Sequence, residues 1–191
     1  MARTRSIKVL DYALQTEDGA ANCERFVEML GLKTFFSAFM GKVSSKYNSD
    51  YYVDVKGEGK KRKLNATSTF EDEEHLLGIL VSLLTNLESD TPPRIRLIAK
   101  FIENDYEKVE RLLEMREIAE NRLRPVDKEI QMEKRVIEAN QSEVDEDMEG
   151  EWYLRRAEAG LSALQNADYV LGWICMEDDG VSFADNVEEQ H

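Results

Sequence analysis

The stretch EEHLLGILVSLLTNL, Glu73 to Leu87, decides the fold. Apolar side chains cover most of the circumference of the helix that it predicts: Leu76, Leu77, Ile79, Leu80, Val81, Leu83, Leu84 and Leu87. The polar or small residues step by three or four and fall on one face: His75, Gly78, Ser82, Thr85, Asn86 and Ser89. A helix with a single polar stripe has neighbours on its other sides, and the stripe can line a groove. This is the layout of the inner helix of an α-solenoid, whose stacked helices form a concave binding surface.

The pattern on either side predicts an all-α protein, an armadillo-like α-solenoid fragment with long charged C-terminal helices. Three prolines and ten glycines in 191 residues favour long helices over many short strands. We divide the chain into a partial armadillo repeat (1–41), a flexible basic insertion (42–70), a helical armadillo-like region (71–141), an acidic linker (142–151), C-terminal helices (152–175) and a disordered acidic tail (176–191). A short strand at Tyr51 to Val53 is the alternative within the insertion.

Local signals set the expected helix ends. Asn22 is a plausible N-cap, and Gly31 stands where a helix commonly ends in a left-handed residue. Pro125 interrupts a long charged stretch, which predicts either two antiparallel helices or one kinked rod. A later helix, 152–165, is expected to bury Leu154, Ala157, Leu161 and Leu164.

The chain is acidic, with a formal net charge of -14. Two runs, 142–151 and 176–190, carry six acids each and no base, and the remainder has 27 acids against 25 bases. Nucleic-acid binding needs basic surface to displace counterions, so direct contact with nucleic acid is not expected. The charge favours basic segments of protein partners instead.

Cysteine and hydropathy patterns indicate a reducing compartment. Cys23 and Cys175 lie in apolar helical patterns, which predicts reduced, buried thiols, and a disulfide between them is the alternative. The N-terminus has no long apolar core, so no signal peptide is expected, and no window is long enough for a membrane span.

The sequence assembles no catalytic, cofactor or metal site. His75 is expected to be solvated or capping rather than catalytic, since the only other histidine is His191. The acids from Asp145 imitate an EF-hand loop, but Arg156 occupies the twelfth position, where a bidentate acid is needed. An enzyme is therefore the weakest hypothesis.

Two candidate sites remain. The basic run Lys60, Lys61, Arg62 and Lys63 fits a nuclear import signal, or else a solubilising loop. The polar stripe supplies the groove candidates for peptide binding: Ser82, Asn86, His75 and Thr85. From spacing alone, Asn86 is equally well explained as a solvent-facing residue or as a ligand for a peptide backbone.

Four blocks resemble successive blocks of the beta-catenin-like protein 1 family: GLKTFFSAFM (31–40), EEHLLGILVSLLTNL, FIENDYEKVERLLEM (101–115) and WYLRRAEAGLSALQ (152–165). The resemblance covers Ile7 to Cys175 and matches the C-terminal part of that family. It implies a nuclear armadillo-type scaffold that accompanies the spliceosome, binds basic, nuclear-localisation-like segments and has no enzymatic activity.

The chain departs from the family pattern in two respects that matter here. Family members are longer, and uncapped solenoid ends expose apolar surface, so we expect self-association or marginal stability. Peptide-binding armadillo proteins usually place a tryptophan four residues before the groove asparagine, whereas this chain has Ser82 there. A structural module that caps or dimerises a larger assembly, without a peptide site, is the alternative function.

Overall fold

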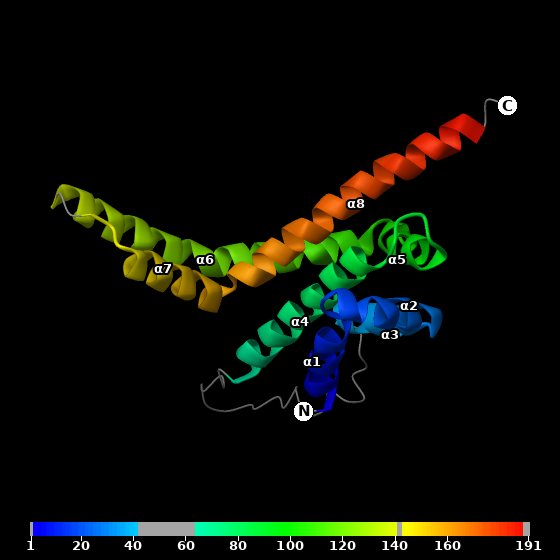
Figure 1. Cartoon of the computed structure of the whole chain (residues 1–191), viewed down its shortest axis with the longest axis horizontal. Helices are drawn as coiled ribbons and strands as arrows, with labels where there is room; N and C mark the ends of the chain where they lie inside the picture. Colours follow the sequence, from blue (N-terminus) through cyan, green and yellow to red (C-terminus); the bar gives the residue numbers. More distant parts are fainter. Residues whose placement is uncertain (1, 42–63, 141–142, 189–191) are drawn as a thin grey trace, which may run out of the picture. The chain divides into compact units, whose positions relative to one another are not determined.

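The computed structural model describes residues 2–41, 64–140 and 143–188, and all regular elements in these ranges are helical (Figure 1). They are α1 (Ala2–Leu14), the short 3-10 helix η1 (Glu17–Gly19), α2 (Ala20–Glu28), α3 (Gly31–Phe39), α4 (Leu64–Asn86), α5 (Pro92–Ile102), α6 (Glu107–Ala139), α7 (Glu146–Ala159) and α8 (Leu161–Glu188). The predicted all-α class is confirmed. The chain divides between Lys108 and Val109 into two compact units, unit 1 before this boundary and unit 2 after it.

Unit 1 is built around α4, the helix that the opening stretch predicts. Six of its apolar side chains are buried, together with Leu87 directly after it: Leu76, Leu77, Ile79, Leu80, Leu83 and Leu84. Helices α1 and α2 pack against α4, and α2 also contacts α5. The ring of Phe36 on α3 meets Phe101 on α5 edge-on, with centroids 5.2 Å apart. Each such buried side chain contributes roughly 2 kcal/mol, so α4 is held mainly by apolar contact.

The helix ends in unit 1 differ from two local predictions. The left-handed residue is Leu30, with φ 63°, while Gly31 begins α3. A glycine is needed at position 31, because a Cβ there would lie 2.4 Å from the Phe26 ring. Asn22 does not cap α2, because the N-cap of this helix is Gly19. The side-chain amide of Asn22 instead donates to the Ala13 carbonyl at the end of α1, at 2.8 Å.

Unit 2 contains most of α6, together with α7 and α8. Pro125 lies inside α6, and the helix continues through it, which decides between the two predicted alternatives in favour of one rod. Figure 1 shows α7 running back along the C-terminal half of α6. Gly160, at φ 110°, ends α7 and separates it from α8. The single helix predicted over 152–165 is therefore wrong, because only a glycine takes this backbone conformation easily.

The buried face of unit 2 is also only partly as predicted. Leu161 is buried, but Leu154 is 62% exposed, and Trp152 is the residue of α7 that is buried. The indole Nε1 of Trp152 donates to Glu133 of α6 at 2.7 Å. Several ion pairs then join α7 to α6, from Arg155 to Glu129 and Glu133 and from Arg156 to Asp127. Charged contacts thus take a larger share of this packing than in unit 1.

Three predicted segment boundaries are wrong. Helix α4 begins at Leu64, inside the predicted insertion, and α7 begins at Glu146, inside the predicted linker. Asp145 caps α7 by accepting a hydrogen bond from the Met148 amide at 2.8 Å, and acids in a first turn suit the helix dipole. Helix α8 extends to Glu188 through most of the predicted tail, since a formed helix propagates at one hydrogen bond per residue. The rest of the insertion, with Tyr51 to Val53 and the basic run, lies outside the described residues.

Candidate functional site

Helix α1 covers much of the polar stripe of α4. Contacts pair Thr4 with Asp72, at 3.3 Å, and the Leu14 carbonyl with Asn86, at 2.9 Å. Residue numbers rise together along the two helices, so α1 and α4 run parallel and side by side (Figure 1). The expectation that this stripe is left free as a groove is wrong, because its polar groups meet α1.

His75 is held at the centre of this junction. Its Nδ1 lies 2.8 Å from Oδ2 of Asp11, and both side chains are largely buried, at 14% and 6% exposed. The Tyr12 ring lies beside the imidazole, with centroids 6.2 Å apart. His75 is thus neither solvated nor a helix cap: it joins two helices.

The glycine of the stripe explains how Asp11 reaches this position. A Cβ on Gly78 would lie 2.7 Å from Asp11 Oδ1, so only a glycine allows the carboxylate to approach α4 so closely. Within the part of the chain that is described, Asp11 Oδ1 is buried and accepts no hydrogen bond. A glycine inside a helix costs about 1 kcal/mol relative to alanine, so its presence is itself a signal of close approach.

Asn86 serves the end of α1. Its amide nitrogen donates to the carbonyls of Leu14 and Thr16, at 2.9 and 3.0 Å, and lies 3.7 Å from Sγ of Cys23. The Leu14 carbonyl belongs to the last turn of α1, where the helix itself supplies no donor, and the Thr16 carbonyl also accepts from the Gly19 amide, at 3.1 Å. Both amide hydrogens are therefore engaged within the chain, and binding of a peptide backbone by Asn86 stays a prediction.

Of the other two groove candidates, Ser82 is buried, at 8% exposed, and Thr85 is exposed. Glu71, Glu74, Val81 and Thr85 follow one another on one face of α4, at helical spacings of three, seven and four residues. Glu71 and Thr85 are exposed, and Glu74 and Val81 are half-buried. Tyr12 of α1, 61% exposed, borders this face through its contact with His75. We call these five residues, Tyr12, Glu71, Glu74, Val81 and Thr85, the α1–α4 strip.

The strip combines acidic and apolar character. Glu71 makes only a long, exposed ion pair with Lys8, at 3.5 Å, and pairs of this kind contribute little and exchange readily. Asp72, Glu73 and Glu74 follow it in the chain, so α4 carries four consecutive acids from Glu71 to Glu74. An exposed aromatic ring beside carboxylates suits the long stem and the charged end of a lysine or arginine side chain.

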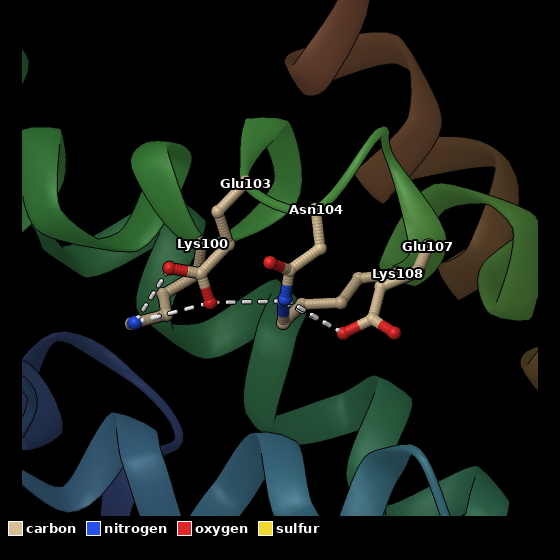
Figure 2. Close-up of polar contacts among 5 residues, drawn as sticks. All are labelled: Lys100, Glu103, Asn104, Glu107 and Lys108. Carbon is tan, nitrogen blue, oxygen red and sulfur yellow. Dashed lines mark hydrogen bonds and ion pairs between the residues drawn. The ribbon is translucent and has the colours of Figure 1, made fainter.

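A second cluster occupies the turn between α5 and α6 (Figure 2). Three consecutive residues there, Asn104, Asp105 and Tyr106, have left-handed φ angles of 59°, 52° and 62°. Asparagine and aspartate tolerate this conformation better than other side chains, but nothing in the spacing predicts three in succession. The Asn104 amide donates to the carboxylate of Glu107, the first residue of α6, at 3.1 Å.

A buried ammonium group fixes this turn. The Lys108 side chain is 4% exposed; its Nζ lies 2.9 Å from Glu103 and 5.7 Å from the centre of the Phe36 ring (Figure 2 shows the Glu103 contact). Hydrogen bonds from Lys100 and then Lys108 hold the pKa of the Glu103 carboxyl below its ordinary value. The cluster is therefore an ion-pair network within unit 1 that ties the end of α5 to Lys108.

Neither cluster offers reactive chemistry. In the ranges that are described, no group of three or more His, Cys, Asp or Glu side chains is placed to hold a metal ion. Burial raises the pKa of the Cys23 thiol, which keeps it protonated and poorly nucleophilic. Cys23 is buried as predicted, whereas Cys175 is exposed, and the two are free rather than joined. None of the described helices is long and apolar enough to cross a bilayer.

Short helices followed by a longer one, with α1 packed in parallel against α4, are typical of a class, the helical repeat proteins of the armadillo type. A profile of the family described as "Catenin-beta-like, Arm-motif containing nuclear" matches residues 1–189. The chain belongs to this family, which confirms the resemblance and the armadillo-like fold. The family is described as nuclear.

Individual relatives agree with this assignment. The chain is 41% identical over 175 residues to "Beta-catenin-like protein 1" of Rattus norvegicus and 39% identical to that of Homo sapiens. It is 33% identical over 176 residues to the "Beta-catenin-like protein 1 homolog" of Schizosaccharomyces pombe. Each alignment covers 92% of this chain, but the chain spans only 26 to 28% of the length of these relatives.

Proposed function

We propose that this chain is part of a non-enzymatic protein-binding scaffold of the pre-mRNA splicing machinery, located in the nucleus, and that it binds basic, nuclear-localisation-like segments of splicing proteins. Membership of a nuclear Arm-motif family supports the scaffold and its location. The splicing role rests on the family resemblance alone.

The observation that carries the basic-partner part of the proposal is the α1–α4 strip. Its carboxylates, the exposed Glu71 and the half-buried Glu74, lie on one face of α4, and Tyr12 of α1 contacts His75, which neighbours Glu74 in the chain. Carboxylates on a fixed scaffold attract basic segments and orient them, which raises association rates and gives specificity. We therefore assign the binding of a basic segment to the α1–α4 strip rather than to Asn86, whose amide donates to the carbonyls of Leu14 and Thr16.

Titration with a basic peptide tests the site. A fluorescein-labelled peptide with two lysine-arginine clusters is added to the full chain, and its anisotropy is followed. The double variant Glu71→Gln with Glu74→Gln should weaken binding by roughly tenfold, and Tyr12→Ala by roughly threefold. The matched control is Glu24→Gln with Glu28→Gln on exposed positions of α2, which makes the same change in net charge.

Three results would count against the proposal. Equal affinities for the wild type and both strip variants would remove the strip as the site. Equal losses in the strip and control variants would reduce the effect to overall charge. Capture of no splicing protein from nuclear extract by the full chain would remove the splicing assignment, even if the peptide binds.

A further inference from the structure

The outer face of α6 has no partner within unit 2. Pro125, Lys128, Met132, Arg135 and Val136 follow one another at helical spacings on this face, and we call them the α6 strip. Met132 is 65% exposed and Val136 is 59% exposed, while α7 and α8 contact the opposite side of the helix through Trp152 and Asp168. Exposed apolar side chains that follow one another on one helix face are typical of an interaction surface.

The bases of the α6 strip differ from the other bases of unit 2. The guanidinium groups of four arginines each contact a carboxylate: Arg116, Arg124, Arg155 and Arg156. Lys134 instead lies over the Trp152 ring, at 4.8 Å. Among the described residues, Lys128 and Arg135 have no such partner, although the chain carries far more acids than bases.

These two bases flank an apolar hollow. A shallow depression of about 300 Å³ is lined by Asp127, Lys128, Gln131, Met132 and Arg135. Lys128 precedes Met132 by one helical turn and Arg135 follows it by almost one turn, so the charges stand on either side of the thioether. Methionine adapts its shape to different apolar partners, which suits a docking position.

We infer that the α6 strip binds an acidic amphipathic helix of a partner protein. An apolar side chain of that helix fills the hollow over Met132, and its carboxylates pair with Lys128 and Arg135. The inference is independent of the basic-peptide site on unit 1, since it concerns other residues and a partner of opposite charge.

The surroundings favour a protein over a membrane or a nucleic acid. Glu129 borders the strip and pairs with Arg155, and Glu138 follows Val136 by two residues. Anionic bilayers and phosphate backbones need several bases over an extended surface, and two bases among acids do not provide it. Two bases at a fixed separation are enough to pair with carboxylates on a helix.

A second copy of this chain is the rival occupant. The outer side of α7 exposes Tyr153 and Leu154, at 61% and 62%, with Asp147 and Glu151 also exposed on this helix. This surface has the required chemistry, but a contact between α6 of one copy and α7 of another closes only if it is reciprocal across a two-fold axis, and otherwise builds rings or open chains. A bound partner helix covers the strip without this geometric condition.

The test uses a synthetic probe of about 20 residues, long enough to form a helix, with a leucine stripe flanked by glutamates. Its binding to the full chain is measured by isothermal titration. Lys128→Glu with Arg135→Glu should raise the dissociation constant by roughly a hundredfold, and Met132→Ser by several-fold. The control, Lys33→Glu with Arg96→Glu on exposed positions of unit 1, makes the same charge change and should leave binding unchanged.

The inference is overturned if the probe does not bind at millimolar concentration, or if the reversed and control variants bind equally well. It is also overturned if a scrambled peptide of the same composition binds as tightly, because the strip would then recognise charge alone. Binding to vesicles of anionic lipid in preference to the probe would assign the strip to a membrane. Concentration-dependent sedimentation of the wild type that the reversal abolishes would assign it to a second copy.

Discussion

Helix α4 carries a polar stripe and helix α6 carries the α6 strip, and the polar side chains of the two differ in whether they meet a neighbouring helix. On α4, His75 and Asn86 bond to α1, and Ser82 is buried. On the outer face of α6, Lys128 and Arg135 meet no partner in the described part of unit 2. A polar stripe on an apolar helix therefore does not by itself identify a groove, because parallel packing of a neighbour can use the same residues.

The two helices also differ in what holds them. Apolar burial holds α4, with side chains such as Leu80 and Leu83 fully inaccessible to solvent. Ion pairs contribute more to the packing of α7 on α6, and surface pairs are individually weak. Substitutions in unit 1 should therefore have larger effects on the free energy of unfolding than substitutions in unit 2.

The largest effect is expected at Arg94. This base is 1% exposed, and its guanidinium donates to the Leu84 carbonyl, near the end of α4. Replacement by leucine removes a charged hydrogen bond and leaves a buried carbonyl without that donor, so Arg94→Leu should lower the free energy of unfolding by about 3 kcal/mol. Urea unfolding followed by far-ultraviolet circular dichroism measures it. The exposed Arg96, replaced in the same way, should change stability by less than about 0.5 kcal/mol.

The next effect concerns Asn86. Asn86→Ala removes the side-chain donor to the Leu14 and Thr16 carbonyls, of which Thr16 keeps the Gly19 amide, and should lower the free energy of unfolding by about 1 to 2 kcal/mol. Ser89→Ala, at an exposed position one turn further on, is the control. Unchanged stability together with weakened peptide binding would restore Asn86 to the groove and contradict the role inferred from its contacts.

The sequence was sufficient for the features that depend on periodic apolar residues. The burial of α4, the continuity of its apolar face and the all-α class follow from that periodicity. It was insufficient for the site, because helical spacing places residues on a face but does not say which neighbour covers the face. Gly78 held the available clue, since a glycine inside a strongly apolar helix indicates close approach.

The boundaries in unit 2 were predicted less well, for a different reason. Asp145 and Gly160 act through a cap and a left-handed φ, and each is a single residue inside a stretch that was interpreted by its composition. The open bases Lys128 and Arg135 were not singled out, because the sequence does not show which charges find partners. They stand out only in the structure, where the neighbouring bases of α6 and α7 contact carboxylates and these two do not.

Substitution of two glycines, one within α7 and one at its C-terminal end, should change the stability of unit 2 in opposite directions. Gly160 has φ 110°, so Gly160→Ala should destabilise unit 2 by about 1 to 2 kcal/mol. A Cβ on Gly150 meets nothing within 4 Å, so Gly150→Ala should stabilise α7 by up to about 1 kcal/mol. Both tryptophans, Trp152 and Trp173, lie in unit 2, so the unfolding midpoint by tryptophan fluorescence reports on this unit. Changes of the same sign would contradict the left-handed end of α7.

The smallest effect is the pH dependence of the contact between α6 and α7. Hydrogen bonds from Arg155 and then Trp152 hold the pKa of the Glu133 carboxyl below its ordinary value. Because the folded pKa is lower than the unfolded one, this contribution is fully present above about pH 4.3 and is lost as pH falls through the folded pKa. Unit 2 should therefore lose stability on acidification, by a modest amount because the ion pair is open to solvent.

Glu133→Gln isolates this contribution. The variant should be slightly less stable than the wild type at pH 7, and the two should converge at a second, acidic pH below the folded pKa of Glu133, where the wild-type carboxyl is protonated. The exposed Glu151, replaced by glutamine, should keep the wild-type difference between the two pH values. Unfolding midpoints are the proper measure, because the indole of Trp152 donates to Glu133 and its fluorescence intensity would respond to the substitution directly. An equal loss of stability on acidification in the wild type and in Glu133→Gln would place the acid-sensitive contacts of unit 2 elsewhere. The packing of α7 on α6 would then depend on Trp152 and its apolar neighbours, just as the packing of α4 depends on apolar burial.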